Sequence, residues 1–232
     1  MRLLPLPGVF QPPSDAWMLA GHIRQPDLGP DAAALDLCTG TGMLAIAAAL
    51  AGAGSVTAVD ISRRAVAAVK LNAWVNRVHV EALRGDLFEP VRDRRFDLIT
   101  SNPPYLPGDL AEPPARGGAR AWEGGRSGRA FIERIAAQAH GHLTERGALL
   151  LVCSTVCDER RTLALLRSGG LAPAVVGRRR GPLGPRLTAR VDWLRAQGML
   201  LEGDQEEILV IRATRVPSGA AAEPPLTGSY TR

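Results

Sequence analysis

Short apolar runs alternate with helical segments along most of the chain, and Gly, Pro or a polar residue stands at most of the boundaries between them. Runs of this length and composition are typical of strands buried in a parallel sheet. We predict strands at residues 33–38, 55–60, 78–83, 95–101, 147–154, 172–177 and 207–213, and helices at 16–20, 43–51, 63–74, 128–143, 158–168 and 191–196. This alternation predicts an α/β fold, doubly wound around a mostly parallel seven-stranded sheet.

The segments outside this pattern divide the chain into regions. Residues 1–30 are expected to form an N-terminal extension, extended at first and then helical, and 31–213 to form one domain. Within it, 106–126 carries many Gly and Pro residues and is expected to be a loop or lid, and 178–206 a basic, irregular insertion. The polar residues 214–232 are expected to be a disordered tail.

The basic charge changes this picture only slightly. A net charge of +5 with a pI near 9.8 is compatible with an acidic partner such as nucleic acid. However, Lys70 is the only lysine, and arginine together with abundant Ala, Gly and Pro indicates GC-rich coding. The densest basic cluster, Arg178-Arg179-Arg180, is therefore interpreted either as a substrate contact or as a solvated loop.

Several classes of protein are excluded by what the sequence lacks. No apolar run reaches the roughly 18 residues that a membrane helix needs, and the N-terminus is too short and proline-broken for a signal peptide. The three cysteines, Cys38, Cys153 and Cys157, are scattered, which predicts a reducing, cytoplasmic location and neither a disulfide framework nor a metal site.

Polar features follow four of the predicted strands. They are Asp36 with its glycine turn, Asp60, Asp86 and Asn102. Because the carboxyl ends of parallel strands meet at one edge of a sheet, where such folds bind ligands, these side chains are expected to converge.

The first of these features, Thr39-Gly40-Thr41-Gly42, favours a nucleoside over a diphosphate. Ile46 stands where a dinucleotide fingerprint has its last glycine, and the lysine of a phosphate-binding loop is absent. The carboxylate of Asp60 can accept both ribose hydroxyls, and that of Asp86 can accept an exocyclic amine such as that of adenine. An acid near the first turn, Asp36, suits a ligand that carries an ammonium group.

The last feature is the corner Asn102-Pro103-Pro104-Tyr105. Two consecutive prolines remove two backbone donors and stiffen the chain, so the Asn102 side chain and the backbone carbonyls are expected to face outward. Such acceptors can hold the two hydrogens of a planar –NH2 group, with the Tyr105 ring over its plane. A proline-rich turn is the alternative, and the convergence of four strand ends favours the clamp.

In this order, Asp36 to Gly42, Asp60, Gly85-Asp86 and the Asn102 corner resemble a class I S-adenosylmethionine-dependent methyltransferase. Within that superfamily the chain is similar to the HemK/PrmC group of protein-glutamine N5-methyltransferases, in its short eukaryotic and archaeal type, which modifies release factors at a Gly-Gly-Gln loop. Three further stretches support the resemblance: Phe10 to Asp15, Ala121 to Gly125 with Gly128-Arg129, and Glu206-Glu207-Ile208.

This resemblance implies a Rossmann-like sheet with one antiparallel strand near the C-terminus, S-adenosylmethionine as cofactor, a protein substrate and, in the short type, a small activator subunit. It implies a catalytic corner made of Asn102, Pro103, Pro104 and Tyr105. The implied cofactor-binding residues are Asp15, Asp36, Cys38, Thr39, Gly40, Gly42, Asp60, Ile61, Asp86, Leu87 and Asn102. Three residues depart from the family pattern. Gln11 stands where the family has an acid, Ala16 where it has a threonine, and Cys38 where it has a glycine.

The expected reaction is in-line displacement of a methyl group from a sulfonium, in which positioning is the main task. Asn102 Oδ1 and the Pro103 carbonyl would accept the two amide hydrogens, and no strong general base is needed. Three other readings stay open: a nucleic-acid amino-methyltransferase for adenine N6 or guanine N2, a small-molecule N-methyltransferase, and a cofactor-binding module without activity. Trp122 is expected to close the lid over the site, with the anchoring of a loop as the alternative, and Trp74 and Trp193 are expected to be packing residues.

Overall fold

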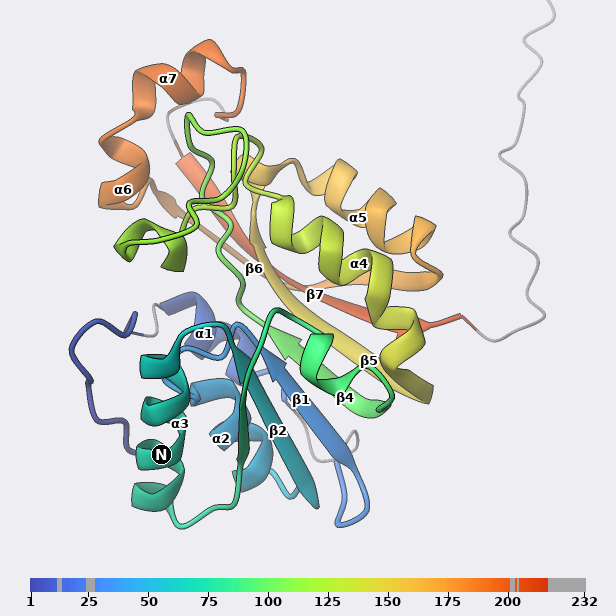
Figure 1. Cartoon of the computed structure of the whole chain (residues 1–232). Helices are drawn as coiled ribbons and strands as arrows, with labels where there is room; N and C mark the ends of the chain where they lie inside the picture. Colours follow the sequence, from blue (N-terminus) through green and yellow to red (C-terminus); the bar gives the residue numbers. More distant parts are fainter. Residues whose placement is uncertain (12–13, 24–27, 201–202, 204, 217–232) are drawn as a thin grey trace, which may run out of the picture.

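A computed structural model describes residues 1–11, 14–23, 28–200, 203 and 205–216 (Figure 1). Most of the predicted tail, 217–232, lies outside the described residues. No helix in the described part of the chain is long and apolar enough to cross a membrane.

Seven strands form one sheet in the order β3-β2-β1-β4-β5-β7-β6. The strands are β1 (Ala33–Leu37), β2 (Ser55–Asp60), β3 (Glu81–Arg84), β4 (Phe96–Ser101), β5 (Leu143–Ser154), β6 (Leu171–Pro182) and β7 (Gln205–Arg215). β7 runs antiparallel to both of its neighbours, β5 and β6, and the other neighbouring pairs are parallel. The predicted sheet, mostly parallel with one antiparallel strand near the C-terminus, is confirmed.

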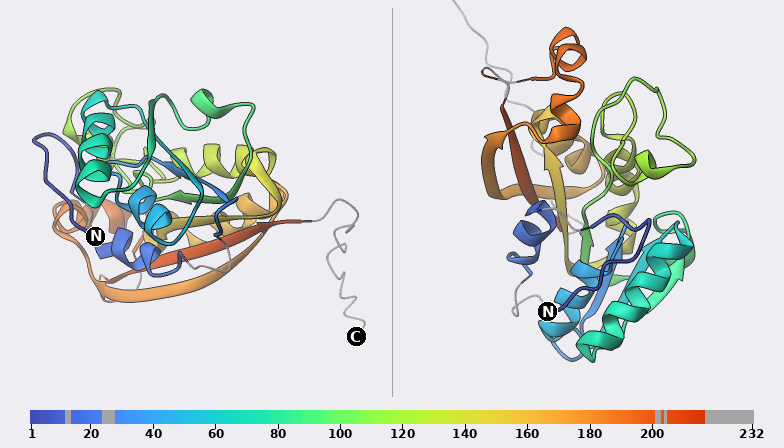
Figure 2. Two further views of the ribbon diagram at one scale, coloured as in Figure 1. Left: turned by 90° about the horizontal axis from the view of Figure 1, so that it is seen from below. Right: turned by 90° about the vertical axis from the view of Figure 1, so that its left-hand side faces the viewer.

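The helices cover both faces of the sheet, as a doubly wound fold requires (Figures 1 and 2). Contacts join α1 to α2 and α2 to α3 on one face, and α4 to α5 on the other. The α-helices are α1 (Ser14–Ala20), α2 (Met43–Leu50), α3 (Arg63–Asn76), α4 (Ala130–His142), α5 (Glu159–Ser168), α6 (Pro185–Thr188) and α7 (Val191–Ala196), and 3-10 turns occupy η2 (Glu89–Val91), η3 (Gly118–Ala121) and η4 (Thr155–Cys157).

The register of the central strands places the predicted site features at one edge. Leu37, the last residue of β1, lies beside Val59 of β2 and Ser101 of β4. The residues that follow these strands therefore leave the sheet side by side. Behind them the core is dry and apolar, with Leu149 to Val152 of β5 fully buried between the two helical layers.

The prediction of an irregular insertion over residues 178–206 is wrong for its first part, which belongs to a strand. β6 continues through Arg178, Arg179 and Arg180, which pair with β7. The arginines disguise the strand because β6 is an edge strand with a largely exposed surface, where charged residues are common. Arg178 forms ion pairs with Glu159 at 2.8 Å and with Glu207, so the cluster is no solvated loop.

The packing role predicted for Trp74 is also wrong, because the side chain is 75% exposed. The buried face of α3 is formed by small residues such as Ala68, Val69 and Ala73, and the next residue points about 100° away from that face. Trp193, in contrast, packs against the core.

Candidate active site

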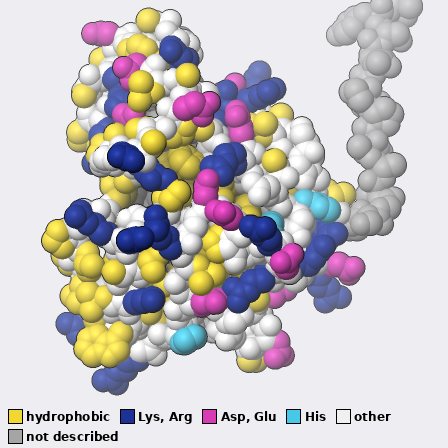
Figure 3. Space-filling model, viewed as in Figure 1, with side chains coloured by type: hydrophobic (Ala, Val, Ile, Leu, Met, Phe, Trp, Pro, Cys, Tyr) yellow, Lys and Arg dark blue, Asp and Glu magenta, His cyan; other side chains and the backbone are white. Residues whose placement is uncertain are grey.

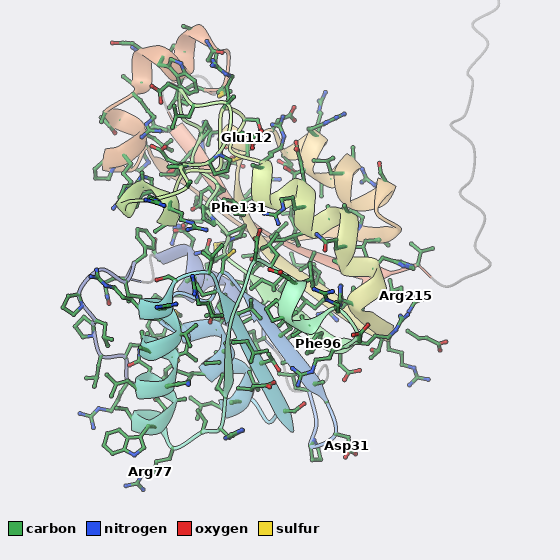
Figure 4. The ribbon with its side chains drawn as sticks, in the orientation of Figure 1. Asp31, Arg77, Phe96, Glu112, Phe131 and Arg215 are labelled. Carbon is green, nitrogen blue, oxygen red and sulfur yellow. The ribbon has the colours of Figure 1, made fainter. Side chains whose placement is uncertain are left out.

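A cavity of about 770 Å³ opens at the carboxyl edge of the sheet. It is bounded by the N-terminal arm, the ends of β1 to β4, the lid 106–126, α4 and the β6–β7 connection. Figure 4 shows one of its walls, Phe131 at the start of α4, near the middle of the molecule. Every residue of the predicted site lines this cavity except Asp36 and Gly42.

The glycine turn after β1 depends on left-handed backbone conformations. Cys38, Gly40 and Gly42 have φ angles of 55°, 56° and 83°. A Cβ atom on Gly42 would lie 3.1 Å from Val69 Cγ2, so this glycine also allows α2 and α3 to pack closely. Cys38 holds a conformation that costs a side-chain-bearing residue energy, which explains why the family pattern has glycine there.

Asp36 lies beneath this turn and not in the cavity. Its carboxylate is buried and accepts hydrogen bonds from Thr39 Oγ1 at 2.5 Å and Thr100 Oγ1 at 2.9 Å. Burial raises the pKa of Asp36 to about 7, although the two hydroxyl donors oppose that shift. The side chain therefore fixes the turn against β4 instead of facing a ligand.

Asp60 connects the end of β2 to the same turn. Its Oδ2 accepts from the Gly40 N–H and its Oδ1 from the Ser62 N–H, both at 2.9 Å. Burial raises the pKa of Asp60 above its ordinary value. Each carboxylate oxygen retains a lone pair, so Asp60 can still accept hydrogen bonds from a ligand in the cavity.

Asp86 follows β3 and is neutralised by an ion pair with Arg134 at 2.7 Å. The neighbouring Gly85 is required by space, because a Cβ atom there would lie 2.1 Å from Pro90 Cγ. Only Asp86 Oδ2 contacts Arg134, and Oδ1 is left to accept from an amine.

An N-terminal arm that the sequence did not place covers the cofactor side of the cavity. Asn72 Oδ1 accepts from the Leu4 N–H at 2.7 Å, and Asn76 Oδ1 accepts from the Arg2 N–H at 2.7 Å. Both amides also donate back to the carbonyls of the same two arm residues. The arm then leads Gly8 to Phe10 along the cavity wall. Two asparagines four residues apart on α3 were the only local signal of this contact.

The corner Asn102 to Tyr105 begins directly after β4. Among the described residues, none donates a hydrogen bond to the Asn102 side chain or to the Pro103 carbonyl. The next two carbonyls are closely packed: a Cβ on Gly124 would lie 2.8 Å from Pro104 O, and one on Gly128 would lie 2.4 Å from Tyr105 O. These glycines therefore let the segment after the lid support the corner from behind.

Tyr105 is buried, and its hydroxyl donates to the Asp15 carboxylate. Burial, reinforced by the charge of Asp15, raises the pKa of Tyr105 well above its ordinary value, so the phenol is neutral at physiological pH. Asp15 also accepts from Arg179 at 3.2 Å. Arg179 of the β6 arginine cluster thus contacts the candidate site through Asp15 of α1.

Three further cavity residues, Phe10, Trp122 and Arg186, come from distant segments, and the sequence analysis did not single out Arg186. The rings of Phe10 and Trp122 have centroids 6.1 Å apart, and the Arg186 guanidinium lies 4.3 Å from the Trp122 centroid. Trp122 was predicted to close the lid, and it lies in the cavity wall as that role requires.

Comparison with known proteins identifies the family of the chain that forms this cavity. Residues 5–168 match the family model described as "Methyltransferase small domain". The chain belongs to this methyltransferase family. A relative from Methanocaldococcus jannaschii, provisionally named a protein N5-glutamine methyltransferase, is 31% identical over 76% of this chain and 87% of its own length.

Other relatives of this methyltransferase are longer proteins. The ribosomal protein uL3 glutamine methyltransferase of Bradyrhizobium diazoefficiens is 43% identical over 50% of this chain, which spans 39% of that relative. Among solved structures, the E. cuniculi Mtq2-Trm112 complex, responsible for methylation of the eRF1 translation termination factor, matches with a TM-score of 0.61 at 20% identity, covering 90% of this chain and 99% of that one. At that identity the structural match establishes the fold alone.

Proposed function

We propose that this methyltransferase transfers a methyl group from S-adenosylmethionine to the side-chain amide nitrogen of a glutamine in a protein. One observation carries the proposal: the Asn102 corner, with its free acceptors, lines the same cavity as the Gly40 turn and Asp60. The glutamine-methyltransferase names of two relatives support the choice of an amide as acceptor.

The cofactor side of the cavity fits an adenosine-containing ligand. The partly buried Asp60 carboxylate retains acceptor capacity for ribose hydroxyls, and Asp86 Oδ1 can accept from the adenine amine. Ile61, Leu87 and Phe131 supply apolar walls for the base. When bound, S-adenosylmethionine supplies an electrophilic methyl group on a positively charged sulfur.

The substrate side must present a poor nucleophile in the right orientation. The lone pair of an amide nitrogen is delocalised, so its reactivity depends on being held with one face toward the methyl group. Asn102 Oδ1 and the Pro103 carbonyl would accept the two N–H hydrogens. Among the described residues, none donates a hydrogen bond to either of these acceptors. The neutral Tyr105 would support the amide plane without itself exchanging a proton.

A second candidate is methylation of a nucleobase amine. The same two acceptors would hold any planar –NH2 group, and the net charge of +5 favours contact with a polyanion. An extruded base would have to enter the same cavity.

A small activator subunit is part of the proposed assembly, as in the Mtq2-Trm112 complex. β3 lies at the edge of the sheet, and Trp74, 75% exposed, lies on the adjoining α3. A strand edge and an aromatic side chain together offer a surface for a second chain. Full activity of the purified chain by itself would contradict this part of the proposal.

The test is transfer of a labelled methyl group from S-adenosylmethionine to a purified release factor and to ribosomal protein uL3. Mass spectrometry of tryptic peptides would locate the label, with total RNA and DNA treated in parallel. The proposal predicts one added methyl group on a glutamine side chain. Label confined to RNA or DNA would contradict it and support the second candidate.

A further inference from the structure

The substrate side of the cavity contains a segment that the cofactor and the Asn102 corner do not use. The connection after β6 contributes Gly184, Pro185, Arg186 and Leu187 to the cavity wall. Since the cofactor side is built by the ends of β1 to β3, this connection lies where the substrate would enter.

Arg186 is the charged residue among these four cavity-lining residues. Its guanidinium lies 4.3 Å from the ring centroid of Trp122 and 5.3 Å from that of Phe10. A guanidinium that stacks on a ring keeps its N–H groups free at the edge of its plane. Among the described residues, no carboxylate pairs with Arg186, whereas Arg179 and Arg190 each form an ion pair.

The position of Arg186 is fixed by its surroundings. Leu187, the next residue, is 1% exposed. Arg190 joins the connection to the lid, because it donates to Pro107 O at 2.7 Å and to Glu123 Oε1 at 2.9 Å. The guanidinium is therefore held in place before a substrate arrives, which reduces the entropy lost on binding.

A carboxylate of opposite charge lines the same part of the cavity. Glu206, near the start of β7, accepts from Ser154 Oγ at 2.8 Å through Oε2. Arg179 is already paired with Asp15, whereas among the described residues neither Arg186 nor Glu206 forms an ion pair. On the space-filling surface, dark blue groups gather where α6 and the lid lie above α3 (Figure 3).

We propose that Arg186 and Glu206 bind the main chain of the substrate polypeptide beside the methylated residue. Arg186 donates to a backbone carbonyl, and Glu206 accepts from a backbone N–H. The two side chains thereby position the glutamine side chain at Asn102. This assignment rests on the proposed function, and it names the substrate as an extended polypeptide segment.

The charge pattern favours a polypeptide over a nucleic acid. A peptide backbone offers an acceptor and a donor at each residue, which matches one cation and one anion. A phosphodiester offers only acceptors, and its charge would be repelled by Glu206. Nucleic-acid contact instead calls for a continuous basic surface.

Steady-state kinetics on the full chain test the assignment. Arg186→Met keeps an aliphatic side chain on Trp122 but removes every donor, and Arg186→Lys restores a charge. Arg180→Ala is the matched control, because Arg180 is exposed on β6 and does not line the cavity. We expect Arg186→Met to raise the KM for the protein substrate about tenfold. The value of kcat, the Kd of S-adenosylmethionine and the unfolding midpoint should stay near wild type.

Three results would contradict the assignment. The first is an unchanged KM in Arg186→Met, and the second is an equal rise in KM in Arg180→Ala. The third is an effect of Arg186→Met on transfer to RNA while protein is left unmethylated. Transfer to protein with an unchanged KM rejects the assignment alone. Absence of protein methylation by the wild-type chain, both alone and with a Trm112-type activator subunit, rejects the proposed function as well.

Discussion

The hydroxyl of Tyr105 donates a hydrogen bond to the carboxylate of Asp15, which lies 90 residues earlier in the chain. This contact ties the corner after β4 to the first helix, and Arg179 on β6 completes the bridge from the other side. The short helix α1 is therefore part of the machinery that holds the corner in place.

Removal of the Tyr105 hydroxyl should be coupled to removal of the Asp15 carboxylate. A buried hydrogen bond to a charged group contributes about 1.5–3 kcal/mol. In a double-mutant cycle of Tyr105→Phe and Asp15→Asn, urea unfolding should therefore give a coupling free energy above about 1 kcal/mol. Simple addition of the two single effects would show that the contact does not support the corner.

Asp60→Ala should weaken cofactor binding by about 10- to 100-fold, because two hydrogen bonds to a carboxylate are lost. Isothermal titration calorimetry with S-adenosylmethionine measures the change. Asp31→Ala is the matched control, since Asp31 is exposed at the far end of the sheet from the cavity (Figure 4). An unchanged affinity in Asp60→Ala would mean that another group holds the ribose.

Substitutions of Cys38 test whether the glycine turn requires a left-handed backbone at this position. Its φ of 55° is relaxed for glycine and strained for a β-branched residue. Cys38→Gly should keep the melting temperature near wild type, whereas Cys38→Val should lower stability by about 2 kcal/mol. If both variants were equally stable, the turn would have adjusted to remove the strain.

Asp36 should make stability fall as the pH rises. Its pKa is raised to about 7 in the folded chain from 3.8, so between these values the folded state keeps a proton that the unfolded state has lost. Each pH unit in this window costs about 1.4 kcal/mol, and the loss ends above pH 7. The free energy of unfolding of Asp36→Asn, relative to wild type, should rise from pH 5 to pH 7. A difference that stays constant with pH would show that Asp36 is ionised throughout.

The strands, most helices and the converging edge could be predicted because each depends on a local pattern. Asp60 and Asn102 follow apolar runs directly, and strand direction brings them together. The extent of β6 could not be predicted, since Arg178 and Arg179 are stabilised by ion pairs with residues outside the segment. The same holds for Arg186 and Asn72, whose partners lie in the lid and the N-terminal arm. No local rule encodes such contacts.

The central claim is that Asn102 holds the accepting nitrogen while other residues hold the cofactor. Asn102→Ala separates the two, because it removes the free acceptor and leaves the Gly40 turn and Asp60 intact. The most direct measurement is methyl transfer to the substrate protein alongside calorimetric cofactor affinity in this variant. We predict that turnover falls at least about a hundredfold while cofactor affinity stays within several-fold of wild type. Near-normal turnover in Asn102→Ala would contradict the account.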